Sequence, residues 1–368
     1  MSSETVPYQP GQRLLSVDFM RGLIMVLLAL ESTRLYDHLG DASGGTVFFG
    51  FFQQFFHHPW NGLLFWDLIQ PGFMFIAGTA MALSLHKQAS RGMTWNQSFK
   101  KILKRSCWLF FWGVLDYAIK PKGLAFELWD VLTQLSFTTL VAFLIFRLSA
   151  SAQIIICIGL LVLTEVLYRF INIPGFDQPF TDQQNFGNYV DLLLMNKINK
   201  DGWVAINCIP TAVHTIAGAL AGKLILSQQP KIKRLLIWAL ICLVAGYGLD
   251  LAGITPAIKR IATSSFTLAS LGWCLAGLAA CYWWIDIRNN RNHLKFFTIV
   301  GMNSIFIYLF FEILGPWFNW YVGTATNGLM GFINTPENLS LIITSLCIFT
   351  LEWLLCYFLY RKKIFFKL

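Results

Sequence analysis

The sequence predicts an all-α, polytopic membrane protein, a helical bundle of about ten transmembrane helices. Three observations predict this class. Hydrophobic residues make up 56% of the 368-residue chain, the mean hydropathy is +0.56, and only 13% of residues are charged. The apolar residues gather in runs of about 20, the length that an α-helix needs to cross a bilayer. A soluble domain of this size does not need so much apolar surface, so the soluble classes are excluded.

We expect the whole chain, 1–368, to form one transmembrane domain, beginning with a polar tail at 1–12. The expected spans lie at roughly 14–36, 60–85, 103–119, 128–147, 152–173, 204–225, 234–254, 263–287, 296–317 and 339–360. The 33 Phe and 14 Trp suit lipid-facing surfaces and interfacial belts. The run FFGFFQQFFHH at 48–58 is too short to span and has glutamines at its centre, so it predicts a helix lying in the outer interface.

The basic residues predict the orientation of these spans. With the N-terminus in the cytoplasm, 19 Lys and Arg fall on the cytoplasmic side and eight on the opposite side. This asymmetry follows the positive-inside rule and predicts that both termini are cytoplasmic. The segments 174–202 and 318–338 then form external loops. The polar N-terminus has no early apolar core, so we expect no cleaved signal peptide.

Charge and cysteine content narrow the function classes. The net charge of +9 lies in short loops between apolar runs, which indicates topology and not a nucleic-acid partner. The eight cysteines form no CxxC pair and lie in or beside apolar segments, so we expect no disulfide or zinc framework and no required metal. The sequence has no P-loop, no GxSxG and no HExxH.

The most informative segment is 57–78, HHPWNGLLFWDLIQPGFMFIAG. A carboxylate such as Asp67 in hydrocarbon costs roughly 2.5–3.5 kcal/mol, so it is usually retained for a purpose. Pro71 frees backbone groups that neighbouring helices or a wet cavity must satisfy. If residues 57–67 formed one continuous helix, His57 and Asp67 would share a face but stand about 15 Å apart. They can form a hydrogen bond only if the histidine lies on a turn. His57 is either a general base at a polar site or an ordinary interfacial residue.

Other polar groups leave similar alternatives open. Asp18 and Arg21 are three residues apart and can pair on one helix face. They form either a structural ion pair at the membrane edge or part of a site for a phosphorylated ligand from the cytoplasm. Glu31 and Arg34 share a face near the outer end of the first span and can border the same cavity as His57. His214, near the middle of a span, indicates either a relay or a hydrogen-bonded core histidine.

Four separated segments carry a family resemblance. They are Arg13-Leu14-Leu15-Ser16-Val17-Asp18 with Arg21-Gly22; His57, Trp60-Asn61-Gly62-Leu63, Asp67, Pro71 and Gly78; Ile209-Pro210 through Gly222-Lys223 with Thr263-Ser264-Ser265-Phe266; and Gly301-Met302-Asn303-Ser304-Ile305 with Tyr308. In these segments the chain resembles the catalytic region of the heparan-α-glucosaminide N-acetyltransferase family and its bacterial relatives. Those are polytopic membrane acyltransferases. The matches run in family order from residue 13 to about 312.

The resemblance implies transfer of an acetyl group from cytoplasmic acetyl-CoA to an amino sugar or glycan on the outer face. The family's catalytic histidine falls on His57, and Asn61 and Asp67 would assist it at the oxyanion and at a neighbouring donor or the sugar. The expected donor-binding residues are cationic or pair with a cation: Asp18, Arg21, Lys101, Lys104 and Arg105, with Lys100 beside them. The expected acceptor-binding residues are Glu31, Ser32, Arg34 and Asn303.

Three positions depart from the family pattern. Ser32 stands where the family often has Asn or His, Gln134 where it has Arg, and Gly202-Trp203 where a Pro-Glu pair is common. These departures keep open an inactive scaffold of the same fold. A transporter or flippase of a small polar or glycan substrate is a separate alternative, for which we would expect inverted repeats and broken helices in matching positions. We expect a bacterial inner-membrane protein. The acceptor sugar, N- or O-acetylation and a homodimeric state are left open by the sequence.

Overall fold

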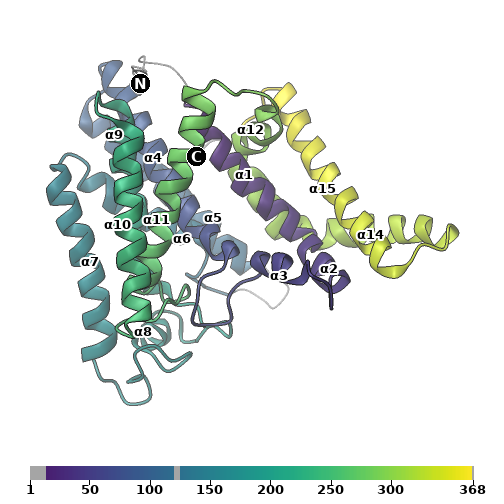
Figure 1. The fold of residues 1–368 in the computed structure, drawn as a ribbon, viewed down its shortest axis with the longest axis horizontal. Coiled ribbons are helices and arrows are strands. Elements are labelled where there is room, and N and C mark those ends of the chain that lie inside the picture. The colour runs from purple at the N-terminus through teal and green to yellow at the C-terminus, as the bar shows by residue number, and fades with distance from the viewer. Residues whose placement is uncertain (1–13, 120–124, 367–368) are drawn as a thin grey trace.

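The computed structural model describes residues 14–119 and 125–366, and it is built from helices (Figure 1). Within these ranges no strand is present, and the one β-type pairing is an isolated antiparallel bridge between Asn61 and Ile258. The expected all-α class is therefore confirmed. The expected tail at 1–12 and four of the counted basic residues, Arg13, Lys120, Lys122 and Lys367, lie outside the described residues.

Most of the main helices follow the predicted spans, but the helix at Trp95–Ala118 begins well before the expected span 103–119, and the expected span 296–317 is broken at Asn303 and continues to Phe332. The main helices are α1 Leu15–Ser32, α4 Ile69–Ser90, α5 Trp95–Ala118, α6 Val131–Leu144, α7 Ala150–Phe170, α9 Cys208–Leu226, α10 Lys231–Leu251, α11 Ser264–Cys281, α12 Leu294–Met302, α13 Ser304–Leu309, α14 Gly315–Phe332 and α15 Glu337–Arg361. Short elements complete the chain: α2 Leu35–Ala42, α3 Phe49–Phe52, η1 Gln53–Phe55, η2 Phe65–Leu68, α8 Phe186–Met195 and η3 Ala205–Asn207, with π-helical turns η4 Tyr282–Ile287 and η5 Phe310–Leu314.

Seven helical stretches of the described chain are long and apolar enough to cross a membrane, so the chain is an integral membrane protein. They are Phe65–Ser90, Ala150–Phe170, Ala205–Leu226, Lys231–Leu251, Ser264–Ile287, Ser304–Phe332 and Glu337–Arg361. The expected count of about ten is not confirmed. The three predicted spans that fall short are helical: α1 and α5 carry several charged residues, and α6 has only 14 residues.

Two other expectations need correction. The segment 318–338, expected as an external loop, is largely helical because α14 continues to Phe332 and packs along α15. The segment 48–58, expected as an interfacial helix, forms only the short turns α3 and η1 before the chain extends at Phe56. By contrast the 174–202 segment contains a single α-helix, α8, which is capped by Asn185.

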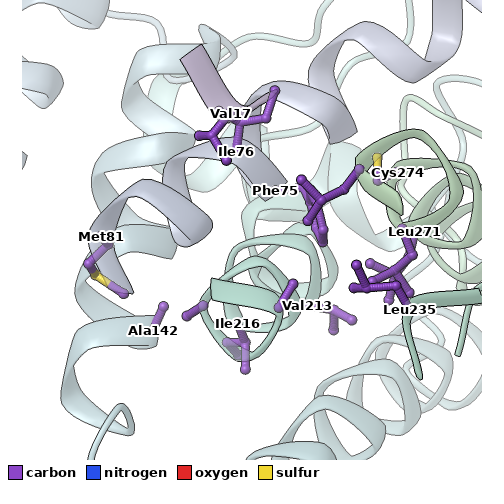
Figure 2. Packing of buried hydrophobic residues seen from close by; sticks show 14 of the residues in the cluster. Val17, Phe75, Ile76, Met81, Ala142, Val213, Ile216, Leu235, Leu271 and Cys274 are labelled. Carbon is purple, nitrogen blue, oxygen red and sulfur yellow. The ribbon is translucent and has the colours of Figure 1, made fainter. Parts of the chain in front are cut away.

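The centre of the bundle is the parallel pair α4 and α9, which approach closely because glycines face the partner backbone. A Cβ on Gly78 would meet the carbonyl of Thr215, and a Cβ on Gly218 would meet the carbonyl of Phe75. Phe75, Val213 and Ile216 are buried at this contact, and Leu271 of α11 extends the cluster (Figure 2). Close backbone approach through small residues is a common way for helices to associate in a membrane.

Pro71 and Pro210 occupy the same local position in this pair. Each is the third residue of its helix, and each follows a 3-10 turn, η2 or η3. A proline in the first helical turn removes no intrahelical hydrogen bond, since that backbone N–H lacks a partner there. Neither proline therefore breaks a helix at mid-span.

The glycine contact leads to a stability prediction. Gly78→Ala should lower the free energy of unfolding by about 1–3 kcal/mol, because the added methyl group forces α4 away from the Thr215 carbonyl. Thermal unfolding of the purified protein in detergent measures the effect. Gly159→Ala on α7 is the matched control, since a Cβ there meets nothing within 4 Å, and it should leave stability unchanged or raise it by up to about 1 kcal/mol. Equal stability of the two variants would contradict the packing argument.

Candidate active site

A loop at 56–64, between η1 and η2, carries His57 at one end of the bundle, here called the His57 end. Two other loops hold it in place. The backbone N–H of Gly62 donates to the carbonyl of Ala257 at 2.7 Å, beside the Asn61–Ile258 bridge. The indole N–H of Trp60 donates to the carbonyl of Phe180 at 2.7 Å, within the 174–202 segment. Segments about 120 and 200 residues away therefore fix the position of this loop.

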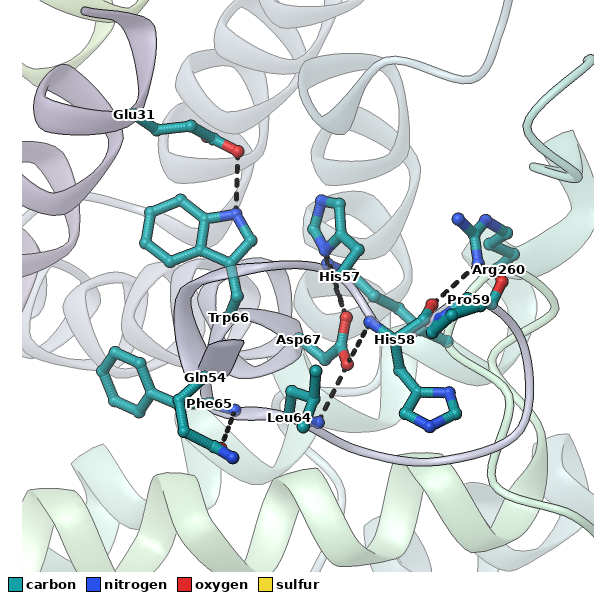
Figure 3. Close-up of polar contacts among 11 residues, drawn as sticks. Glu31, Gln54, His57, His58, Pro59, Leu64, Phe65, Trp66, Asp67 and Arg260 are labelled. Atoms are coloured by element: carbon teal, nitrogen blue, oxygen red, sulfur yellow. Dashed lines mark hydrogen bonds and ion pairs between the residues drawn. The ribbon is translucent and has the colours of Figure 1, made fainter. Parts of the chain in front are cut away.

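Asp67 is the buried centre of the site. It lies in η2, where its Oδ2 accepts the backbone N–H of Leu64 at 3.0 Å and that of His58 at 3.3 Å. Its Oδ1 lies 3.1 Å from His57 Nδ1 (Figure 3). The Asp67 side chain is 1% exposed, whereas that of His57 is 39% exposed. The carboxylate thus holds one edge of a ring whose other edge is open to solvent.

His57 and Asp67 are in contact because the histidine lies on a turn, which is the condition that the sequence set for a bond between them. The separation of about 15 Å applies only to a continuous helix. Phe56 is extended and η2 begins only at Phe65, so the chain folds back and brings the two side chains together. The local reason is that Asp67 receives two loop N–H groups, which closes the loop around its carboxylate.

Lys259 completes the cluster, and it comes from the loop between α10 and α11. Its Nζ lies 3.0 Å from His57 Nδ1 and 3.5 Å from Asp67 Oδ1. The Lys259 side chain is 8% exposed. Nδ1 either donates to Asp67 or accepts from the ammonium group, so the two contacts cannot both be hydrogen bonds at one time. The tautomer of His57 is therefore coupled to the proton on Lys259.

Burial lowers the pKa values of both Lys259 and His57, and neighbouring charges modify the shifts. Burial lowers the pKa of Lys259 to about 8, although Asp67 and Glu31 oppose the shift by favouring its charged form. Burial also lowers the pKa of His57 below its ordinary value, with the hydrogen bond to Asp67 opposing and the charge of Lys259 adding to the shift. At neutral pH His57 is therefore mainly neutral and Lys259 mainly charged. A neutral imidazole is the form that can accept a proton.

Two tryptophans enclose the cluster. The indole N–H of Trp66 donates to Glu31 Oε1 at 2.8 Å, which brings the end of α1 to the site (Figure 3). Trp203 lies edge to face with His57, with ring centroids 6.4 Å apart. Lys259 Nζ lies 5.5 Å from the Trp203 ring centroid, a cation–π contact. Trp203 therefore packs against both His57 and Lys259, while much of the His57 ring stays exposed.

The expected acceptor residues separate into two groups. Glu31 reaches the site through Trp66. Ser32 does not join the cluster, since its hydroxyl donates to the carbonyl of Ala29 and its own carbonyl accepts from Asn319. Arg34 has φ +61° just beyond the end of α1, so it leaves the helix face of Glu31 and pairs with Asp37 at 3.3 Å on the surface.

Asn61 and Asn303 also differ in their placement. Asn61 is exposed beside the cluster, and its backbone pairs with Ile258, the residue before Lys259. Asn303 is remote from His57. Its side chain donates to the carbonyl of Ile364 at 3.0 Å and accepts the N–H of Phe366 at 3.0 Å, so it ties the C-terminal segment to the break between α12 and α13. An acceptor-binding role for Asn303 has no geometric support here.

The expected donor residues lie at the opposite end of the bundle. Arg21 NH2 pairs with Asp18 Oδ1 at 2.7 Å, as the spacing predicts. Arg105 of α5 lies close enough for its charge to repel that of Arg21. Lys101 and Lys104 are exposed on the same helix, and Lys101 contacts the sulfur of Met93. The structure therefore groups Asp18, Arg21 and Arg105 and leaves the two lysines on the surface.

The sequence reasoning did not select Lys259 or Trp203 as site residues. The signal for Lys259 was present, because Lys259 and Arg260 form a basic pair on the side that is otherwise poor in basic residues. Arg260 donates to the carbonyls of His58 and Pro59, so it braces the 56–64 loop. His214 is fully buried in α9 with Nε2 2.9 Å from the Ser270 hydroxyl, which agrees with a hydrogen-bonded core histidine.

Comparison with known proteins identifies distant relatives. The chain is 24% identical to human heparan-α-glucosaminide N-acetyltransferase over an alignment of 425 residues, which covers 97% of this chain and 60% of the human protein. It is 24% identical to the mouse protein of the same name over 438 residues, covering 98% of this chain and 62% of the mouse protein. No protein-family model matches the chain. The chain thus spans about three fifths of the length of these relatives. This integral membrane protein is accordingly a distant relative of the heparan-α-glucosaminide N-acetyltransferases.

Proposed function

We propose that the protein is a membrane-embedded acetyltransferase that moves an acetyl group from cytoplasmic acetyl-CoA to an amino sugar or glycan at the outer face. The His57–Asp67–Lys259 cluster carries the proposal, because it places an accessible imidazole against a buried carboxylate and a buried cation. The charge asymmetry supports an orientation with both termini inside and the His57 end outside. A bacterial inner membrane fits this orientation.

The chemistry requires a neutral amine and a stabilised oxyanion. In the base form, His57 Nδ1–H donates to Asp67 and the lone pair on Nε2 faces the acceptor. The amine nitrogen attacks the thioester carbonyl, and Nε2 takes the amine proton. The tetrahedral intermediate collapses, the carbon–sulfur bond breaks, and the proton passes to the CoA thiolate. The products are the N-acetyl sugar and CoA thiol. In the alternative sequence, Nε2 attacks first and carries the acetyl group as an acyl-imidazole before the amine receives it.

Each polar neighbour of His57 has a distinct part in this scheme. Lys259 keeps Asp67 ionised and His57 neutral, since a positive charge at 3.0 Å from Nδ1 opposes imidazolium formation. Asn61, exposed beside the cluster, has a side-chain amide that can donate to the oxyanion. Glu31, held by Trp66, is the carboxylate we assign to the acceptor sugar. These assignments place acceptor binding on the α1 side of His57.

The donor nucleotide is assigned to the opposite end of the bundle. Arg21 and Arg105 repel each other there, and Asp18 supplies one compensating charge. An added phosphate relieves such repulsion, and guanidinium groups bind phosphate oxygens in pairs. A second cationic place exists at the same end, a cavity of about 650 Å³ lined by His86, Arg147 and Lys223 among others. The Arg21–Arg105 group and this cavity are therefore two candidate entry sites for acetyl-CoA.

The enzyme proposal is tested with acetyl-CoA labelled in the acetyl group. Purified full-length protein is incubated with the labelled donor, with and without glucosamine as the acceptor. Label on glucosamine supports the enzyme, and label on the protein alone identifies the acyl-imidazole route. Binding of CoA without any transfer of label would instead favour the inactive scaffold. Absence of both binding and transfer would overturn the proposal.

Arg21→Ala should weaken CoA binding about tenfold while leaving glucosamine affinity unchanged, because it removes one charge-assisted contact to phosphate. Calorimetric titration of each ligand checks this. Lys233→Ala is the control, since Lys233 is an exposed cation at the start of α10 and is not among the expected donor residues. If CoA affinity is unchanged in Arg21→Ala, the donor enters instead by the cavity lined by Arg147 and Lys223.

A further inference from the structure

A second site lies on the lipid-facing side of the bundle, away from His57. A groove of about 490 Å³ runs between α7 and α10 and is floored by α9 and α11. These helices lie at the left of Figure 1, where α7 forms the edge of the bundle. The groove stays open because α7 packs on α9 whereas α10 packs on α11. α7 and α10 are also the two least buried of the seven membrane-spanning stretches.

Most of the groove is lined by apolar side chains. Its rims are exposed apolar side chains, including Ile158 of α7 and Trp238 and Ile241 of α10. Its floor is formed by buried residues such as Leu271 and Leu275 of α11. Such a surface at bilayer depth is filled by hydrocarbon and not by water. A volume of this size is in the range of a ligand-binding pocket.

The end of the groove opposite the His57 end is polar and positive. Lys223, Ser227, Gln229 and Arg234 line it there, at the end of α9 and the start of α10. None of the described lining residues is acidic. Arg234 is exposed, and Lys223 is the nearer cation to the apolar floor, with its ammonium group against the Phe146 ring and carbonyl. The groove therefore matches an apolar chain that ends in a negative charge at the membrane surface.

We propose that this groove is a binding site for an anionic phospholipid of the leaflet at the end opposite His57. One acyl chain occupies the space between α7 and α10, and the phosphate lies at Arg234 and Gln229. The charge complementarity at the mouth favours an anionic lipid over a zwitterionic one. The bound chain joins α7 to α10 across the gap, so occupancy stabilises the folded protein by mass action.

The test measures lipid binding by the delipidated full-length protein in detergent. Phosphatidylglycerol and phosphatidylcholine are each titrated while the melting temperature is recorded, and native mass spectrometry counts bound lipids. Phosphatidylglycerol should stabilise the protein at lower concentration than phosphatidylcholine. Arg234→Gln should weaken phosphatidylglycerol binding about fivefold, since one basic residue near an anionic headgroup contributes roughly that factor.

Two further variants make the outcome decisive. Lys233→Gln is the matched control, because Lys233 is an exposed cation one residue away that lines a different surface with Leu236 and Leu240. It should leave phosphatidylglycerol binding unchanged. Leu220→Trp fills the groove from α9 and should remove the tightly bound lipid from the mass spectrum. Equal effects of Arg234→Gln and Lys233→Gln, equal binding of the two lipids, or retention of bound lipid in Leu220→Trp would each overturn the proposal. So would loss of a dimer in Leu220→Trp, which would assign the groove to a second copy of the chain.

Discussion

His57→Ala is expected to abolish acetyl transfer, with a fall in kcat of about 10²–10⁴-fold. The reason is that general acid–base catalysis by a positioned side chain contributes a factor of this order. The ring is 39% exposed and rests on a carboxylate that is itself held by two backbone N–H groups, so its removal leaves that frame in place. Initial rates of label transfer from acetyl-CoA to glucosamine measure the loss.

The controls for His57→Ala separate chemistry from folding. The melting temperature of the variant should stay near that of the wild type, and CoA should bind with unchanged affinity because the proposed donor residues, Arg21 among them, lie at the other end of the bundle. His58→Ala is the neighbouring control, since only the backbone N–H of His58 contacts Asp67. Wild-type turnover in His57→Ala would remove the central residue from the mechanism.

Lys259→Met is expected to have the second-largest effect, a loss of about tenfold in kcat/KM at pH 7. Without the neighbouring ammonium group the pKa of His57 rises, so a smaller share of the imidazole is the neutral base at pH 7. The ring also loses one of the two groups that contact Nδ1, and misplacement of a catalytic group lowers the rate further. Lys259→Arg keeps a positive charge and should recover most of the activity. The measurement is kcat/KM for glucosamine in the three proteins.

The pH profile distinguishes a positioning role of Lys259 from a merely structural one. Because the pKa of Lys259 is about 8, the wild-type ammonium group is present below that pH and is lost as the pH rises through it. A neutral amine can accept Nδ1–H of His57 and so compete with Asp67 for it, which loosens the ring, and activity should therefore fall above about pH 8 in the wild type. Lys259→Arg should extend activity to higher pH, since guanidinium stays charged there. Lys200→Met, at an exposed lysine of the 174–202 segment, should keep the wild-type profile. Identical profiles in the wild type and Lys259→Arg would exclude this role.

The acidic side of the same profile reports on His57. Burial lowers the pKa of His57 below its ordinary value, so the imidazole stays neutral, and the base stays active, to a lower pH than a solvated histidine would allow. In Lys259→Met this limb should move toward neutral pH, because the repulsive charge is gone. The acceptor amine titrates identically in every variant, so differences among the variants belong to the protein.

The prediction from sequence was most successful where the deciding interactions are local. A helix satisfies its own backbone hydrogen bonds, so runs of about 20 apolar residues suffice to predict membrane helices and their approximate ends. The same local logic predicted the Asp18–Arg21 pair, which is three residues apart on α1. It failed for Glu31 and Arg34, because α1 ends at Ser32 and the left-handed backbone at Arg34 separates the two side chains.

By itself, the sequence determined that this chain is an all-helical membrane protein and that His57 and Asp67 are unusual residues for their setting. Only the tertiary structure decided that Lys259, 202 residues from His57, shares their site and that Asn303 lies at the C-terminal segment instead. The physical reason is that side-chain type and helical periodicity are local properties, which neighbouring residues in the sequence determine. The meeting of two loops, by contrast, depends on how α4, α9 and α11 pack, which is set by close glycine contacts between distant segments.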